Sequence, residues 1–326
     1  MTVDAPGAAP DALRLGTRAS LLATTQSQHV ADAITAATGI PVVLVPITTD
    51  GDVLTGSLAQ MGGTGVFATA LREALLRGEC DLVVHSMKDL PTAAYAGLEI
   101  AAVPVRAPQG DVLCTAEGVT LDDLPAGAVV GTGSPRRVAQ VRRRRPDLEV
   151  RDIRGNVDTR LRKMHDGDYD AIVLAEAGLR RIGRDAAIGQ LFALDGWPTS
   201  AGQGALAVEV RTADLDGPIG AAVRTIDDAD AAARARLERA VLRLLEAGCA
   251  APVGIAATGD GADARLVAEV YALDGSRTVR AERALDADLH DAGARERIAV
   301  DVVSELLSGG AADIADLPGS SRGPAR

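Results

Sequence analysis

Short runs rich in Val, Ile and Leu alternate with stretches of helical periodicity along the first two thirds of the chain. The run PVVLVPITT follows a helical stretch at 20–38, and the run DLVVHS follows another at 66–77. Such alternation is typical of strands joined by crossover helices, because two parallel strands need a long connection between them. We therefore expect an α/β fold built on parallel sheets covered by helices.

A second series of strand and helix patterns begins near residue 110 and repeats a local feature of the first. LGTRAS at 15–20 and VGTGSPRR at 130–137 both run from a strand through Gly-Thr into a helix that opens with serine. Ser134 suits an N-cap, and Pro135 suits the first helical turn. Two similar βα lobes around a cleft, like those of periplasmic binding proteins, are the expected arrangement, with ligands at the carboxyl ends of the strands.

The pattern changes after about residue 227, where a long amphipathic helix precedes strand-like segments and a final helix. Asp274-Gly275 between two of these segments is a hairpin signal. We expect a smaller α+β domain at 227–310, a first lobe at 12–105 plus 200–222, and a second lobe at 106–199. The ends, 1–11 and 311–326, have the composition of disordered segments.

Composition and charge narrow the possible partners. The formal net charge is −11 and aromatic residues make up 2% of the chain, which argues against a nucleic-acid binder. No apolar run approaches the length of a membrane span. The start, MTVDAPGAAPDALRLG, lacks the basic region and apolar core of a signal peptide. We expect a cytoplasmic protein that binds neither nucleic acid nor membrane.

Arginine is concentrated in one part of this acidic chain. Between residues 134 and 184 there are thirteen Arg and one Lys against eight acidic residues. We expect the run 142–145 to lie mostly on solvated helix faces. Five other arginines stand at strand-to-helix turns, where backbone N–H groups already favour anions. Together these arginines predict a cleft that binds a polyanion. These are Arg18, Arg136, Arg137, Arg154 and Arg160.

Motifs for nucleotide binding are missing from the sequence. There is no Walker loop, and no GxGxxG follows the first strand. Gly62, Gly63, Thr64 and Gly65 form a glycine-rich stretch that we interpret as a lid loop.

The segment DLVVHSMKDLP carries an apolar strand directly into Lys88 and Asp89. A charged pair at the carboxyl end of a strand would stand at the mouth of the cleft, although an isolated pair of this kind is also typical of a capped turn. We interpret His85 as a structural histidine, and the scattered histidines predict no metal site. Cys80 and Cys114 lie in strand-like runs and are expected to pack as small apolar residues.

Cys249 lies in the small-residue segment EAGCAAPVG, just after the long helix. The sequence offers neither metal-ligand partners nor an activating histidine nearby. Ordinary packing and a reactive loop thiol that carries an attached group both remain open on the residues alone.

Six segments together closely resemble the porphobilinogen deaminase (hydroxymethylbilane synthase) family: HSMKDLP, GTGSPRR, IRGNVDTRL, EAGLRRIG, AGQGALAVE and LEAGCAAPVG. They occur in the family's order from about residue 13 to the final helix. The resemblance implies a transferase of tetrapyrrole and haem biosynthesis that condenses four porphobilinogen molecules head to tail and releases ammonia at each step. It implies a dipyrromethane cofactor joined by a thioether to Cys249, and Asp89 as the catalytic acid. It places cofactor and substrate binding on Arg18, Ser20, Lys88, Thr132, Ser134, Arg136, Arg137, Arg154, Gly155, Arg160, Arg181 and Gln203.

The chemistry implied by the resemblance agrees with the arginine-rich region, because every porphobilinogen carries two carboxylates. A carboxylate at Asp89 would stabilise positive charge on the reacting pyrroles and relay protons. The chain departs from the common family pattern at Leu21, Thr64 and Ala247, where proline, lysine and glycine are frequent. A monomer is expected. The alternative is a non-enzymatic, two-lobed anion-binding protein, which would leave the cysteine loop unexplained.

Overall fold

The computed structural model describes residues 11–47, 65–115, 118–248 and 251–317. The chain divides into two compact units. One comprises Met1–Arg106 with Ala205–Ala232, and the other comprises Ala107–Gly204 with Ala233–Arg326.

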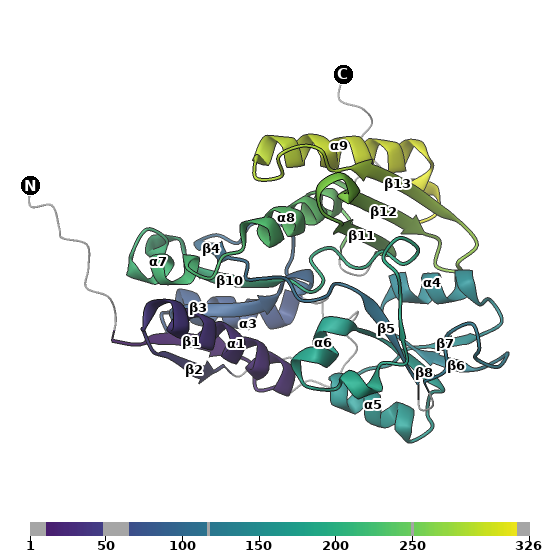
Figure 1. Cartoon of the computed structure of the whole chain (residues 1–326), viewed down its shortest axis with the longest axis horizontal. Coiled ribbons are helices and arrows are strands. Elements are labelled where there is room, and N and C mark those ends of the chain that lie inside the picture. Colours follow the sequence, from purple (N-terminus) through teal and green to yellow (C-terminus); the bar gives the residue numbers. More distant parts are fainter. Residues whose placement is uncertain (1–10, 48–64, 116–117, 249–250, 318–326) are drawn as a thin grey trace, which may run out of the picture. The chain divides into compact units, whose positions relative to one another are not determined.

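The first unit is built on a five-stranded mixed sheet with the order β2-β1-β3-β10-β4 (Figure 1). Strands β2, β1 and β3 are parallel to one another, whereas β10 is antiparallel to β3 and to β4. The strands are β1 (Leu13–Thr17), β2 (Val42–Pro46), β3 (Leu82–Ser86), β4 (Leu98–Ala102) and β10 (Leu206–Arg211).

Helices cover both faces of this sheet because the side chains of each strand alternate between the faces. Leu82 and Val84 of β3 belong to an apolar cluster with α1 (Leu21–Thr38) and α7 (Pro218–Arg224). Val83 belongs to a second cluster with α3 (Gly65–Leu76) and Cys80.

The second unit contains a sheet of the same design, with the order β7-β6-β8-β5-β9. Again three neighbouring strands are parallel, and the next strand along, β5, is antiparallel to both of its neighbours. The strands are β5 (Asp111–Thr115), β6 (Val129–Gly131), β7 (Glu149–Arg151), β8 (Ala171–Ala175) and β9 (Gln190–Leu191), accompanied by α4 (Pro135–Arg144), α5 (Val157–His165) and α6 (Glu176–Arg181).

The expected fold class of two βα lobes plus a smaller α+β domain is confirmed, but the expected parallel pairing holds for only three neighbouring strands of each lobe. In each of the two five-stranded sheets one strand runs against the other four, β10 in the first lobe and β5 in the second. In the first lobe, β10 enters from a distant part of the chain and is therefore not constrained by a local crossover helix.

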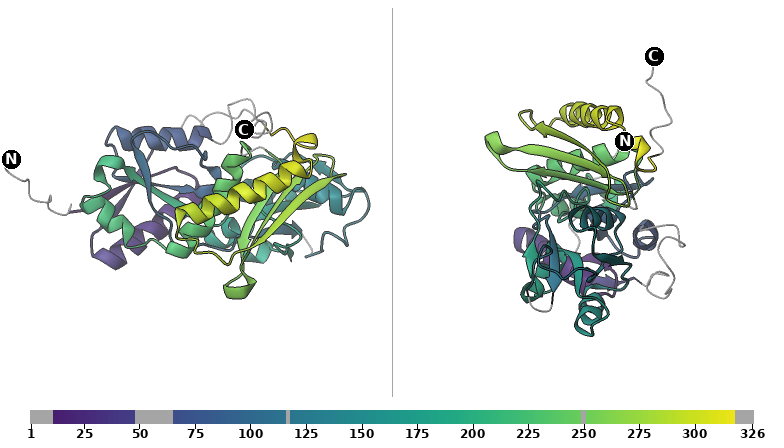
Figure 2. Two further views of the ribbon diagram at one scale, coloured as in Figure 1. Left: turned by 90° about the horizontal axis from the view of Figure 1, so that it is seen from above. Right: turned by 90° about the vertical axis from the view of Figure 1, so that its right-hand side faces the viewer.

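A third sheet, also in the second unit, is antiparallel with the order β11-β12-β13. It consists of β11 (Val253–Thr258), β12 (Arg265–Tyr271) and β13 (Thr278–Ala284), packed with α8 (Ala229–Leu244) and α9 (Ala292–Ser308) around one apolar core. Helix α9 lies along this sheet in both views of Figure 2. The predicted turn joins β12 to β13: Gly275 has φ 78°, and a Cβ there would meet the backbone nitrogen of Arg143 at 2.5 Å.

Cys80 and Cys114 are fully buried in the cores, as expected. Burial raises the pKa of Cys80 to about 11 and that of Cys114 to about 12, so both thiols stay protonated near neutral pH. Within the described ranges, no helix is long and apolar enough to span a bilayer. The predicted boundaries of three domains, and the predicted disorder at both ends, stay predictions.

Candidate active site

A pocket of about 210 Å³ in the first unit lies where β1 and β3 end. These strands are parallel neighbours, so the residues that follow them meet at one edge of the sheet. Arg18 directly follows β1, Ser86 is the last residue of β3, and Asp89 is the last residue of the short turn after β3. All three side chains line the pocket. The structure therefore brings together the predicted acid and one predicted arginine.

Asp89 is held in place by its neighbours in the chain. It ends a 3₁₀ turn, Met87–Asp89, whose first residue is buried and donates its backbone N–H to the carbonyl of Ala205 at 3.0 Å. Leu90 on the other side is 1% exposed. Two buried anchors thus fix the backbone while the Asp89 side chain stays exposed to the pocket.

Two more of the predicted binding residues stand beside this pocket. Ser20 caps α1, and its side chain accepts a hydrogen bond from the backbone N–H of Ala23 at 3.4 Å. Lys88 is half-buried in the turn before Asp89. Gln26, which the sequence did not single out, also lines the pocket, and its Nε2 donates to the Ser86 hydroxyl at 3.2 Å.

A buried charge network includes His85, which lines the pocket. Arg72 of α3 holds both oxygens of Glu209 side-on, with Nε to Oε2 at 2.8 Å and Nη2 to Oε1 at 2.6 Å. Nε2 of His85 lies 3.1 Å from Oε2 of the same carboxylate. Burial would raise the pKa of Glu209, but the contacts with His85 and Arg72 outweigh it and lower this pKa to about 2. The structural role expected for His85 agrees with this arrangement.

Replacing Glu209 by glutamine is expected to lower the free energy of unfolding at pH 7 by about 3 kcal/mol, because Arg72 loses its buried counter-ion. The folded-state pKa of Glu209 lies below its ordinary value of 4.5. The native protein therefore has this stability above pH 4.5 and loses it as the pH falls toward 2, so the difference between native and variant protein shrinks over that window. Urea unfolding across pH measures both effects, with Glu99→Gln, a change at the exposed residue of β4, as the matched control. A difference that stays constant down to pH 3 would contradict the assignment.

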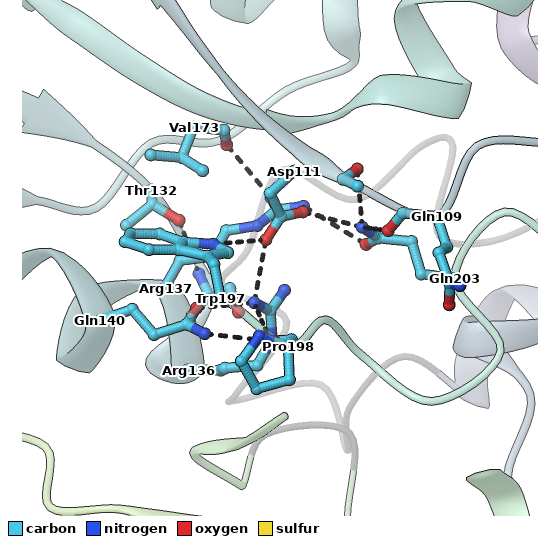
Figure 3. A network of polar contacts seen from close by, with 12 residues as sticks. Gln109, Asp111, Thr132, Arg136, Arg137, Gln140, Val173, Trp197, Pro198 and Gln203 are labelled. Carbon is cyan, nitrogen blue, oxygen red and sulfur yellow. Dashed lines mark hydrogen bonds and ion pairs between the residues drawn. The ribbon is translucent and has the colours of Figure 1, made fainter. Parts of the chain in front are cut away.

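Asp111 is the centre of a buried polar network in the second unit (Figure 3). Its side chain is fully buried at the start of β5, and it binds two arginines from the first turn of α4. Arg136 Nη1 donates to Oδ2 at 2.9 Å, and Arg137 Nη2 donates to Oδ1 at 2.6 Å. The two predicted anion-binding arginines are therefore brought together, around a carboxylate of the protein itself.

Neutral side chains complete the shell around Asp111. Nε1 of Trp197 donates to Oδ2 at 3.1 Å, and Nε2 of Gln203 donates to Oδ1 at 2.8 Å. Gln203 also donates to the carbonyl of Gln109 at 2.8 Å, which ties the AGQG segment to the strand start (Figure 3). The sequence singled out Gln203 but neither Asp111 nor Trp197.

The network carries one positive charge in excess, since two buried guanidiniums face one carboxylate. Burial opposes ionisation of Asp111, but the two guanidiniums outweigh it and lower its pKa far below the ordinary value. Burial also lowers the pKa of Arg136. Among the described residues, Nε and Nη2 of Arg136 and Nε of Arg137 have no hydrogen-bond partner although they are buried. Buried donors without partners are costly, so the site is suited to an added anion.

The other predicted residues of this unit lie at neighbouring turns. Thr132 is buried, and its Oγ1 accepts from the backbone N–H of Ser134 at 3.3 Å. Ser134 occupies the N-cap of α4, as expected, but its side chain makes no capping hydrogen bond. Arg181 Nη2 donates to the carbonyl of Gly204 at 2.7 Å, and burial lowers the pKa of Arg181 to about 10. A desolvated cation of this kind favours an anionic ligand.

Arg154 and Arg160 flank the start of α5. Arg154 Nε donates to Asp152 Oδ2 at 2.7 Å, and Arg160 Nε donates to the carbonyl of Gly155 at 2.8 Å. Gly155 has φ 116°, and a Cβ there would lie 2.7 Å from the Thr159 side chain, so no other residue fits without strain. Both arginines remain more exposed than Arg136 and Arg137.

The expectation of solvated faces for 142–145 is wrong in part. Arg143 Nη1 donates to Glu269 at 2.9 Å, and Arg142 Nη1 donates to the carbonyl of Leu273 at 3.0 Å, so both fasten α4 to the antiparallel sheet. Arg145 donates to the carbonyls of Leu121 and Leu124. These partners are distant in the sequence, which is why the local pattern did not show them.

Cys249 and residues 62–64 of the predicted lid loop lie outside the described residues, and Gly65 is described as the first residue of α3. Within the described ranges, no group of three or more His, Cys, Asp or Glu side chains is arranged to hold a metal ion.

Comparison with known proteins shows which family the chain resembles. Residues 13–217 match the model described as porphobilinogen deaminase, dipyromethane cofactor binding domain, and residues 232–307 match porphobilinogen deaminase, C-terminal domain. The porphobilinogen deaminase of Leifsonia xyli subsp. xyli is 53% identical over 314 residues, which cover 94% of this chain and 95% of that protein. The porphobilinogen deaminase of Cutibacterium acnes is 49% identical over 329 residues, covering 95% and 98%.

Among solved structures, the methionine binding protein MetQ matches with a TM-score of 0.44 and 10% identity, covering 70% of this chain and 96% of that chain. The family models and the curated relatives do not favour the alternative of a non-enzymatic anion-binding protein. The chain therefore belongs to the porphobilinogen deaminase family, the hydroxymethylbilane synthases that carry a dipyrromethane cofactor and use porphobilinogen as substrate.

Proposed function

We propose that the chain condenses four porphobilinogen molecules on a dipyrromethane primer held by a thioether at Cys249, with Asp89 as the catalytic carboxylate. The observation that carries this proposal is the pocket in which Asp89 and Arg18 lie together at the ends of two parallel strands. At one sheet edge, the acid can exchange protons with the pyrrole ring while the guanidinium binds a carboxylate of the same substrate.

The residues present fit a ligand rich in carboxylates. Arg136 and Arg137 have buried N–H groups without a partner among the described residues, and Arg181 is desolvated. A dipyrromethane carries four carboxylates, each able to accept charge-assisted hydrogen bonds from such donors. The residues proposed to hold cofactor and substrate are Arg18, Ser20, Lys88, Thr132, Ser134, Arg136, Arg137, Arg154, Gly155, Arg160, Arg181 and Gln203.

When bound, the cofactor supplies the terminal pyrrole to which the first substrate is joined. The part of this chain in the reaction is to bind, to orient and to stabilise charge. Asp89, exposed on a fixed backbone, accepts hydrogen bonds from pyrrole N–H groups and stabilises positive charge as ammonia leaves. It can also take up the proton released when each new bond forms. The arginines neutralise carboxylates so that a lengthening polyanion is retained.

We further propose that the protein acts as a monomer in the cytoplasm, without nucleic acid or membrane as a partner. The acidic net charge of −11 supports the exclusion of nucleic acid. Size-exclusion chromatography with light scattering measures the oligomeric state, and a stable dimer would contradict this part of the proposal.

Incubation of the purified protein with porphobilinogen tests the proposed reaction. We expect ammonia release together with hydroxymethylbilane, detected as its cyclised product uroporphyrin I. We also expect an intact mass that exceeds the sequence mass by two pyrrole units, and a pink-red colour with Ehrlich's reagent. A folded, unmodified protein that consumes no porphobilinogen would refute the proposal.

A further inference from the structure

The hydrogen bonds of Arg136 are concentrated on one nitrogen of its guanidinium. Nη1 donates to Asp111 Oδ2 at 2.9 Å, to Gln140 Oε1 at 2.7 Å and to the Pro198 carbonyl at 3.2 Å. Nε and Nη2 are buried and have no partner among the residues that the structure describes. The described part of the chain therefore contacts Nη1 of this guanidinium and leaves the Nε–Nη2 edge without a hydrogen bond.

The unused edge is the one that binds a carboxylate side-on. In the first unit, Arg72 uses its Nε and Nη2 to hold both oxygens of Glu209 at 2.8 and 2.6 Å. Parallel N–H groups on this edge match the two oxygens of a carboxylate, which makes the pairing strong and directional. Arg136 is thus prepared for a bidentate carboxylate, provided that its plane is held in the right orientation.

Gln140, one helical turn further along α4, is one of the groups that hold this orientation. Its Oε1 accepts from Arg136, while its Nε2 donates to the Tyr271 hydroxyl at 2.9 Å and to the Pro198 carbonyl at 3.0 Å. An amide without fixed partners can rotate by half a turn and present its NH₂ group to the arginine. The acceptors on the Nε2 side prevent this rotation.

Tyr271 is able to act as such an acceptor because its single hydroxyl proton is engaged elsewhere. Tyr271 is 1% exposed at the end of β12, and its hydroxyl donates to Glu269 Oε2 at 2.7 Å. Arg143 Nη1 donates to the other oxygen of Glu269 at 2.9 Å. In this series of hydrogen bonds between Arg136 and Arg143, each donor and acceptor is therefore fixed. The antiparallel sheet sets this order, because it carries Tyr271 and Glu269.

We propose that Tyr271 is a positioning residue that acts through Gln140 to orient Arg136, so that its Nε–Nη2 edge binds a pyrrole-borne carboxylate side-on. This inference rests on the function proposed above and deepens it. It gives the antiparallel sheet a part in ligand binding that is separate from the cysteine after α8.

Tyr271→Phe tests the proposal, because it removes one hydroxyl and keeps the ring. The protein is produced in a host that makes no porphobilinogen, and cofactor loading is then followed by intact mass as porphobilinogen is added. We expect the half-maximal concentration for loading to rise about tenfold, the effect of losing about one hydrogen bond's worth of binding free energy. In the loaded enzyme, KM rises by a similar factor while kcat stays within about twofold, because Tyr271 does not touch the reacting atoms.

Two further variants make the test specific. Tyr95→Phe, the same change in the other unit beside Arg72, controls for the loss of a hydroxyl and should load like the native protein. Gln140→Leu breaks the same chain on the Arg136 side and should reproduce the shift, so the test does not depend on one variant folding.

The outcomes separate this inference from the proposed function. A native protein that neither loads nor consumes porphobilinogen refutes the proposed function and, with it, this inference. A native protein that loads normally, alongside Tyr271→Phe and Gln140→Leu variants whose half-maximal concentrations lie within twofold of it, refutes the positioning role alone. The same conclusion follows if the variants lose only thermal stability, since that is the result of a purely structural role.

Discussion

Replacing Asp89 by glutamate is expected to reduce kcat at least about a hundredfold while the cofactor remains attached. The added methylene displaces the carboxylate from the position that the buried residues Met87 and Leu90 fix for it. Charge stabilisation and proton transfer both depend steeply on this position, whereas binding of ligand carboxylates depends on the arginines. Steady-state kinetics with porphobilinogen, together with intact mass for cofactor content, measures the two effects separately.

Asp216→Glu provides the matched control, since Asp216 is an exposed aspartate of the same unit outside the pocket. It should leave kcat unchanged. If Asp89→Glu keeps more than about half of the native kcat with a full complement of cofactor, the catalytic assignment of Asp89 is wrong.

The sequence was sufficient for the parts of the site that are local. The step from an apolar strand into Lys88 and Asp89, and the serine-led helix starts at Ser20 and Ser134, depend on residues close together in the chain. The structure places each of them at the end of a strand or the start of a helix, as expected. Patterns of this kind are readable because period and capping are properties of a short segment.

The partners that determine what each arginine does could not be predicted in this way. Asp111 lies 25 residues before Arg136 and 92 before Gln203, and the run DVLC does not show which residues its carboxylate contacts. One signal was present: an acidic residue at the head of a strand that is buried along its whole length needs a cationic partner. The direction of β10 and β5 was likewise undetermined, since apolar runs do not specify whether a strand is parallel.

The two buried ion networks show how the same residue types serve opposite purposes. Arg72 donates from Nε and Nη2 to the two oxygens of Glu209, so this edge of its guanidinium is paired within the protein and stabilises the fold. Arg136 donates from Nη1 to Asp111, whereas its Nε and Nη2 have no hydrogen-bond partner among the described residues. The sequence shows two arginines in amphipathic helices, and only the orientation of each guanidinium separates the structural one from the one suited to a ligand.

Replacing Cys249 by serine is expected to abolish both the added mass and the activity with porphobilinogen. A hydroxyl is a far weaker nucleophile than a thiolate at neutral pH and does not form the thioether. Without its anchor the primer can be lost between steps, so no lengthening chain is retained. Intact mass, the colour with Ehrlich's reagent and the rate of uroporphyrin formation are the three measurements, and all three should fall to background.

Cys114→Ala is the control, because the Cys114 thiol is buried and its pKa is raised to about 12 by that burial. A thiol that stays protonated and inaccessible does not form the linkage, so this variant should keep the added mass and lose only stability. The opposite pattern, with mass retained in Cys249→Ser and lost in Cys114→Ala, would move the anchor to the core strand. Retention in both variants would place it on another residue and remove the assignment of Cys249 altogether.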